Sequence, residues 1–231
     1  MKDLSKLPYI DKEDPWSSHS IIVMWLKRLP EKSTILDIGT ASGTIGRLCN
    51  DLGFVLKGIE PNPEWAKLAN PYYEYMSNCA VDDVDDEFIQ GADGVIMADV
   101  LEHLSDPETT LARVTNLQQT NCLIIISVPN VANIWIRMNL LFGKFEYSER
   151  GILDKTHLRF FTRASFIRLL NKCDLEIKEF RSTPIPLNIL HPFFNINPLG
   201  QFIHHALATC TQLFPSLLGY QFVVLARKQT N

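Results

Sequence analysis

Short apolar runs rich in β-branched residues alternate along the chain with longer segments whose apolar positions follow a helical period. The runs predict strands near residues 34–38, 54–59, 78–81, 94–98, 122–127, 175–181 and 220–227. Helical patterns lie between them; the first helix is predicted over Ser17–Leu29, and another ends at Gly53. This alternation predicts an α/β fold with a parallel sheet and right-handed crossovers, in which ligands bind beyond the carboxyl ends of the strands.

The segment ILDIGTASG joins the first predicted strand to a glycine-containing turn. Gly39 and Gly43 allow a tight turn in which the backbone approaches a ligand. A dinucleotide-binding turn has the spacing G-x-G-x-x-G, which the order Gly39, Ala41, Gly43 does not reproduce. Asp37, at the end of the strand, repels a diphosphate but attracts an ammonium or hydroxyl group. We therefore expect a cofactor that carries a cationic amino acid, with a glycine turn of another α/β protein as the alternative.

A second acid ends the second predicted strand. Glu60 falls 23 positions after Asp37, and an acid about 20 residues beyond such a turn accepts hydrogen bonds from ribose hydroxyls. Taken alone, Glu60 would be interpreted as a surface acid that caps a helix. The order and spacing of the two acids favour the ribose role.

Composition narrows the class of protein. A chain of 231 residues with 46% hydrophobic residues predicts one domain over 1–231. A net charge of −4, with the charges interspersed, excludes a broad basic face for nucleic acid. Five cysteines form no C-x-x-C pair, and the first 15 residues contain no apolar signal segment. These features predict a cytoplasmic protein with reduced cysteines.

The segments ILDIGTASG, GIEPNPEWAKLA and VIMADVLEHLSDP, in this order, resemble class I S-adenosylmethionine-dependent methyltransferases. DPWSSHS, residues 127–162 and the closing YQFVVLARK are similar to a bacterial subgroup associated with surface-glycan or small-molecule pathways. The resemblance covers roughly residues 14–228. It implies a Rossmann-like, seven-stranded, mostly parallel sheet with a reversed edge hairpin and helices on both faces, and S-adenosylmethionine as the cofactor.

The resemblance also implies where the cofactor binds. The expected cofactor-binding residues are Asp37, Gly39, Thr40, Ala41, Gly43, Glu60, Pro61, Asp82, Asp83, Asp99 and Val100. Either Asp82 or Asp83 would read adenine, although a charge run is also typical of a solvated loop. Asp99 would reach the cofactor cleft from the end of the fourth strand.

Three residues are candidates for acid–base catalysis. His103 follows Asp99 by four positions, and histidine side chains commonly transfer protons in catalysis; a role in orienting the loop or packing against the cofactor is the alternative. In the predicted insertion over the active site, residues 129–161, the period-two pattern of 151–162 indicates one polar face. Asp154 and His157 could act together there as a general base, and Arg159 could bind an anionic group. The alternative is a structural ion-pair network that fastens the insertion to the sheet. Asn130 is a further substrate-binding candidate.

Residues 184–215 are apolar, rich in proline and nearly uncharged, and lie between the last two predicted strands. Interruptions by proline and polar residues prevent the segment from spanning a bilayer. We expect it to cap the substrate pocket, with contact to a membrane surface as the alternative. His204 and His205 are expected on a helix surface, and the spacing of potential ligands predicts no metal.

The expected activity is methyl transfer to a small-molecule, sugar or lipid-linked acceptor, with O-methylation leading over C- and N-methylation. The opposing hypothesis is a non-catalytic S-adenosylmethionine-binding or partner-binding protein that retains the fold. A nucleotide-dependent oxidoreductase is disfavoured by the turn spacing. The sequence does not specify the oligomeric state.

Overall fold

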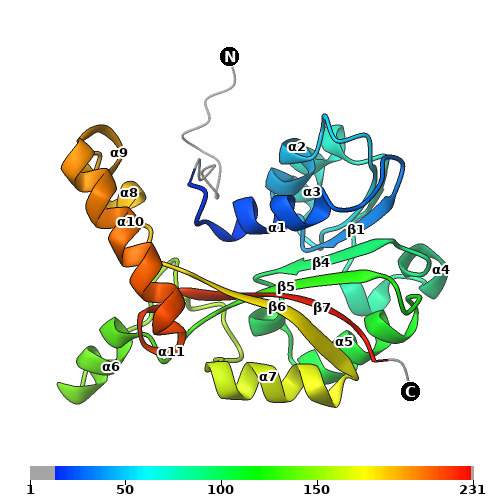
Figure 1. Cartoon of the computed structure of the whole chain (residues 1–231). Coiled ribbons are helices and arrows are strands. Elements are labelled where there is room, and N and C mark those ends of the chain that lie inside the picture. Colours follow the sequence, from blue (N-terminus) through cyan, green and yellow to red (C-terminus); the bar gives the residue numbers. More distant parts are fainter. Residues whose placement is uncertain (1–13, 230–231) are drawn as a thin grey trace.

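The computed structural model describes residues 14–229, apart from the side chain of residue 188. A seven-stranded sheet has the order β3-β2-β1-β4-β5-β7-β6, in which β7 runs antiparallel to both β5 and β6 (Figure 1). The strands are β1 Thr34–Ile38, β2 Val55–Ile59, β3 Tyr75–Ser77, β4 Gly94–Ala98, β5 Leu123–Pro129, β6 Leu175–Thr183 and β7 Gln221–Lys228. This arrangement confirms the predicted fold class and its reversed edge hairpin.

Helices cover both faces of the sheet because each strand directs alternate side chains to opposite sides. Ile35 packs with α1 in one buried cluster, whereas the next residue, Leu36, belongs to the cluster that includes α5 and α7. The α-helices are α1 Ser18–Leu26, α2 Thr44–Leu48, α3 Pro63–Ala69, α4 Asp86–Ile89, α5 Pro107–Asn116, α6 Ile134–Leu141 and α7 Arg163–Lys172. Short 3₁₀-helices, η2 Asn70–Tyr72, η3 Val81–Asp83 and η4 Leu101–His103, complete this part of the fold.

Three predicted boundaries are wrong. The third strand occupies Tyr75–Ser77 instead of 78–81, because the chain turns at residue 78 and then forms the 3₁₀-helix η3. The helix after the glycine turn ends at Leu48, and residues 50–53 form turns. The first helix ends at Leu26 instead of Leu29. Most of the segment used to predict the absence of a signal peptide lies outside the described residues, and the single domain stays a prediction.

The connection from β5 to α7 contains α6 and a long irregular loop. The period-two pattern of residues 151–162 forms no strand; two isolated bridges, Asn130 with Phe161 and Ser148 with Asp154, are its only pairings among the described residues. The Asp154 carboxylate accepts from the backbone N–H of Thr156 at 2.8 Å. Such local side-chain bonds favour turns over a strand ladder.

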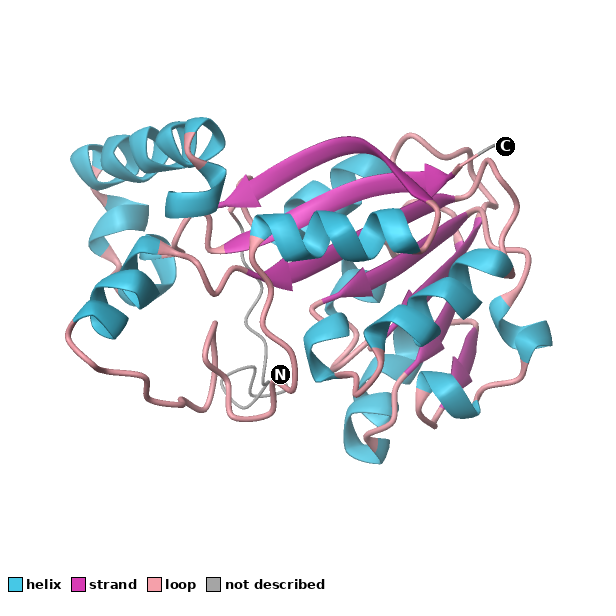
Figure 2. Ribbon diagram, turned by 90° about the horizontal axis from the view of Figure 1, so that it is seen from below, coloured by secondary structure: helices cyan, strands magenta, loops and turns pink. Residues whose placement is uncertain are grey.

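Four helices between β6 and β7 form a helical arm: α8 Leu187–Leu190, α9 Phe193–Ile196, α10 Pro198–Leu213 and α11 Pro215–Leu218. The arm extends past the carboxyl-end edge of β5, with α6 beside it (Figures 1 and 2). In residues 14–229, no helix has the length and apolar character needed to cross a membrane. His204 is not a surface residue as predicted; it is buried in α10, with Nε2 2.8 Å from the carboxylate of buried Asp14.

Candidate functional site

The turn after β1 requires backbone conformations that favour glycine. Gly39 and Gly43 have φ of +75° and +83°, and a Cβ on Gly39 would lie 2.6 Å from Cγ2 of Val100. Ala41 adopts φ +46° despite its side chain. The backbone N–H groups of Gly39 and Thr40 donate to the carbonyl of the last β2 residue. The β1 turn is therefore packed closely between β2 and the loop after β4.

Glu60 links the turns that follow β1 and β2. One carboxylate oxygen accepts from the Ala41 N–H at 2.8 Å and the other from the Asn62 N–H at 2.9 Å. The side chain is 3% exposed, and burial raises the pKa of its carboxyl group. Glu60 thus stabilises the strained Ala41 turn while its acceptor oxygens lie at the carboxyl end of β2.

Asp37 is buried beneath this turn. Its carboxylate accepts from the Tyr73 hydroxyl at 2.5 Å, and the same hydroxyl accepts from the Gly46 N–H at 3.1 Å. Burial raises the pKa of Asp37 to about 7, and the charge of Glu60 adds to this, although the Tyr73 hydrogen bond opposes it. A cationic group in the cleft would therefore encounter two adjacent acids.

The carboxyl end of β4 carries a third acid in a strained conformation. Asp99 has φ +56°, and its carboxylate accepts from the Ser127 hydroxyl at 2.9 Å and from the Gln221 side-chain amide. Val100 follows and contacts the Gly39 turn. Residues of β5 and β7 therefore hold Asp99 beside the predicted cofactor cleft.

The residue that directly follows β3 is neither Asp82 nor Asp83, the two acids expected to bind adenine. The Asp82 carboxylate accepts from the Thr110 hydroxyl at 2.7 Å, whereas Asp83 is exposed on η3. The residue directly after β3 is Asn78, whose amide donates to the carbonyls of Glu60 and Pro61 at 2.7 and 3.2 Å. Sequence reasoning missed Asn78 because it placed the strand three residues too late.

The catalytic candidates do form one cluster, but with a different pairing. The Asp154 carboxylate accepts from the Thr156 hydroxyl at 2.7 Å, and this hydroxyl lies 3.2 Å from Nδ1 of His103. His157 packs edge-on against His103, with ring centroids 4.9 Å apart, and its Nδ1 lies 3.1 Å from the Ile152 carbonyl. Asp154 is thus connected to His103 through Thr156. Its hydrogen bond with His157 in the described part of the chain is between backbone groups, because the His157 N–H donates to the Asp154 carbonyl at 3.1 Å and the carboxylate does not contact the imidazole.

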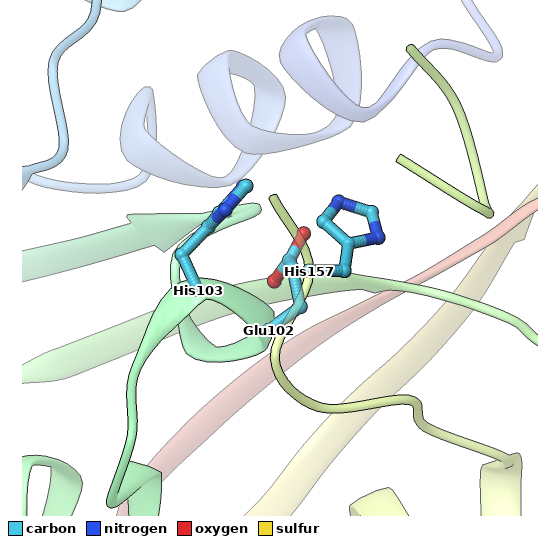
Figure 3. A group of neighbouring side chains, drawn as sticks. All are labelled: Glu102, His103 and His157. Atoms are coloured by element: carbon cyan, nitrogen blue, oxygen red, sulfur yellow. The ribbon is translucent and has the colours of Figure 1, made fainter. Parts of the chain in front are cut away.

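Glu102 was not predicted, although it precedes His103. In Figure 3 its carboxylate lies between the two imidazole rings. The side chain is 1% exposed, and neither carboxylate oxygen has a hydrogen-bond partner in the described part of the chain. Burial, followed by the charge of Asp99, raises the pKa of Glu102 well above its ordinary value. Its sequence neighbours, Leu101 and His103, gave no signal of this burial.

The two substrate-binding candidates lie elsewhere. Asn130 is fully buried, and its side-chain amide donates to the Gly219 carbonyl at 2.9 Å, while its oxygen accepts from the Ala132 N–H. The Arg159 guanidinium donates to the Ser105 carbonyl and borders an open depression of about 300 Å³. Asp106 also lines this depression, which disfavours an anion there. Asn130 therefore anchors the loop after β5, and the substrate-binding roles of Asn130 and Arg159 stay predictions.

Residues from the amino-terminal segment complete the edge near Asp99. A small pocket is lined by Asp14, Trp16 and Tyr220, together with Gln221, the residue that donates to Asp99. Burial, followed by the charge of Asp99, raises the pKa of Tyr220. The sequence DPWSSHS contains no pattern that connects it to β7, so its place beside Gln221 could not be predicted.

The strand order, the left-handed glycine turn and the acids at the ends of β1, β2 and β4 define a Rossmann-like class I methyltransferase. The model of the family described as "Methyltransferase domain" matches residues 18–179. The chain belongs to this family, and its cofactor is S-adenosylmethionine. Adjacent buried acids fit this cationic cofactor and its ribose hydroxyls. No curated protein matches the chain.

Solved structures share the fold at low sequence identity. The magnesium protoporphyrin IX methyltransferase of Synechocystis PCC 6803 is 12% identical, with a TM-score of 0.64, over 97% of this chain and 92% of that one. A SAM-dependent methyltransferase of Archaeoglobus fulgidus is 17% identical, with a TM-score of 0.57, over 91% and 94%. A complex of the Haloferax volcanii Trm112 activator and a methyltransferase gives 16% identity, a TM-score of 0.62, and coverage of 92% and 90%.

Proposed function

We propose that this protein is an O-methyltransferase that acts on a hydroxyl group of a small-molecule, sugar or lipid-linked acceptor. The observation that carries the proposal is the cluster of His103, His157 and Asp154 beside Asp99, at the carboxyl end of β4. Val100, one residue from Asp99, contacts the Gly39 turn. The imidazole groups therefore lie next to the predicted cofactor cleft.

The imidazole rings suit a hydroxyl acceptor. Nδ1 of each ring lies near a backbone carbonyl, Thr156 at 3.3 Å from His103 and Ile152 at 3.1 Å from His157. A carbonyl only accepts, so Nδ1 carries the proton and Nε2 keeps a lone pair for a hydroxyl donor. When bound, S-adenosylmethionine supplies an activated methyl group for the acceptor oxygen. The rings orient that oxygen, and Asp154 is a positioning residue that acts through Thr156.

Lipid linkage of the acceptor is supported by the surface of α6 and the helical arm. Of twenty exposed large apolar side chains among the described residues, fifteen lie within residues 135–147 or 189–214. No charged residue occurs between positions 182 and 226. The Asn133 amide, at the start of α6, donates to the carbonyls of Leu218 and Gly219 at 3.2 and 2.8 Å, which joins the two parts. An apolar surface of this extent is typical of a partner or membrane contact.

The subgroup and compartment belong to the same proposal. The five cysteines are free, and three of them are buried, which supports a reducing compartment such as the bacterial cytoplasm. A lipid-linked glycan precursor at the inner face of a membrane would bring its hydroxyl groups to the edge from which the arm extends.

The activity is tested by acceptor-dependent formation of S-adenosylhomocysteine with hydroxylated sugars, polyprenyl-linked sugars and amines as acceptors. We expect turnover with a hydroxylated acceptor, and we expect His103→Ala to lower kcat while the calorimetric Kd for S-adenosylmethionine is unchanged. The matched control is His205→Ala, because His205 is exposed on α10. Cofactor binding without turnover on any acceptor would favour the non-catalytic alternative, and methylation of amines alone would refute O-methylation.

The membrane contact is tested separately by flotation with vesicles of neutral and anionic phospholipids. Leu199→Ser and Phe202→Ser alter side chains of α10 that are 61% and 70% exposed, and both should reduce flotation. Met24→Ser is the matched control, since Met24 is 47% exposed on α1. Equal recovery of all variants, or no flotation of the wild type, would refute lipid contact by the arm.

A further inference from the structure

Three potential metal ligands converge at the loop after β4. Glu102, His103 and His157 each offer one donor atom, and these atoms lie within 4.8 Å of one another (Figure 3). Bonds of about 2.1 Å in tetrahedral geometry place two donors about 3.4 Å apart. Side-chain rotations that move the donor atoms by about 1 Å would bring the three donors to this spacing without a change in the backbone.

The hydrogen bonds of both histidines fix the ring orientation that a metal ligand needs. Nδ1 of His103 lies near the Thr156 carbonyl and hydroxyl, and Nδ1 of His157 near the Ile152 carbonyl. Histidines that bind metals commonly donate their other ring N–H to such a group. The hydrogen bonds described for the two rings, within residues 14–229, all involve Nδ1, which leaves Nε2 of each ring as a potential metal donor.

The third donor is a carboxylate with no other role in the described structure. Both Glu102 oxygens are buried and lack a hydrogen-bond partner among the described residues. A buried carboxylate is destabilising unless a cation or hydrogen bonds compensate it. A dication bound at these oxygens would supply that compensation, and exposed His103 leaves it a path from solvent.

We propose that Glu102, His103 and His157 bind one divalent first-row transition-metal ion, with zinc as the ion that the donor set fits best. Two imidazole nitrogens and one carboxylate form the ligand set of open zinc and iron sites, whereas magnesium prefers oxygen donors throughout. The ligand spacing predicted no metal because the two histidines stand 54 positions apart in the sequence. The fold, and not the local pattern, brings them together.

This inference deepens the proposed function, and it rests on that function for one point. The point is that an acceptor hydroxyl occupies the open coordination positions of the ion. An acceptor hydroxyl bound there would become more acidic. Its proton would pass to solvent, and its oxygen would then take the methyl group that the cofactor releases. With the ion bound, His103 and His157 would orient the acceptor oxygen through the ion.

The test is metal binding to the full-length protein after removal of any affinity tag and dialysis against a chelator. Calorimetry with zinc should give one site per chain, and cobalt should give a visible absorption band typical of a nitrogen and oxygen site. Glu102→Gln and His157→Ala should each weaken the Kd for zinc by 10-fold or more. Glu102→Gln keeps the size and shape of the buried side chain, so it should fold as well as the wild type.

His205→Ala is the matched control, because its ring is exposed on α10, packs edge-on against Trp16 and is not one of the three ligands; its zinc affinity should equal that of the wild type. S-adenosylmethionine binding, measured on the same samples, separates this inference from the proposed function. Failure to bind zinc or cobalt with intact cofactor binding would overturn the metal site alone. Zinc binding that persists unchanged in both ligand variants would also overturn it.

Discussion

Asp37→Asn should remove a large part of the pH dependence of stability. The buried carboxyl group of Asp37 has its pKa raised from an ordinary value of 3.8 to about 7. Between these values the native state retains a proton that the unfolded chain loses. Stability from this group is therefore complete below about pH 4 and decreases as the pH rises toward 7.

The magnitude follows from the size of the shift. A difference of about three pKa units corresponds to about 4 kcal/mol, reached in full only above pH 7. Between pH 5 and pH 8, Asp37 should reduce the free energy of unfolding by about 2.5 kcal/mol. The asparagine variant has a side-chain oxygen that still accepts from the Tyr73 hydroxyl, but it has no charge to bury.

Urea unfolding of both proteins at pH 5, 6, 7 and 8 measures the effect. The wild type should lose about 2.5 kcal/mol more than Asp37→Asn across this range, because all other titrating groups are shared. Parallel profiles would refute the raised pKa. At pH 7, binding of a cationic cofactor near Asp37 should also release a fraction of a proton from the wild type. Calorimetry in buffers of different ionisation enthalpy detects this release, and Asp37→Asn should show none.

Three further predictions concern single contacts. Gly39→Ala should weaken S-adenosylmethionine binding in calorimetry, because the new Cβ would lie 2.6 Å from Val100 Cγ2 at a φ of +75°; Val100→Ala should restore part of the loss, and an unchanged Kd would contradict the packing. His204→Ala removes the imidazole partner of the buried Asp14 carboxylate and leaves the Trp16 N–H; it should lower the free energy of unfolding by about 1–3 kcal/mol in urea titration, whereas an unchanged free energy would contradict this buried hydrogen bond. Asn78→Ala should weaken cofactor binding with little change in unfolding, and the reverse pattern would show a purely structural amide.

The sequence predicted the architecture well because strand–helix alternation and glycine turns are local properties. The sheet order then follows from the few topologies that right-handed crossovers permit. Errors arose where local signals were weak: β3 has only three residues, and the alternation at 151–162 comes from side chains that bond to their own turn. The register error at β3 directed attention to Asp82 and away from Asn78.

The cluster at β4 shows the other limit of sequence-based inference. Asp154 and His157 are three positions apart in the sequence, which suggested a direct pair, yet Thr156 occupies the Asp154 carboxylate and connects it to His103. Glu102 gave no signal because its burial depends on residues 151–159 folding back over η4, where the backbone N–H groups of Leu158 and Arg159 both donate to its carbonyl. Such long-range contacts cannot be derived from spacing.

Backbone strain supports the assignment of this edge as the functional one. Two of the four described non-glycine residues with positive φ, Ala41 and Asp99, lie in the turns after β1 and β4. Each such conformation costs about 1–2 kcal/mol and persists only where other contacts enforce it. Here Glu60 binds the Ala41 N–H, and Ser127 and Gln221 bind the Asp99 carboxylate. The strained backbone and the buried acids therefore depend on the same hydrogen bonds, so a substitution that frees either turn should weaken cofactor binding before it unfolds the sheet.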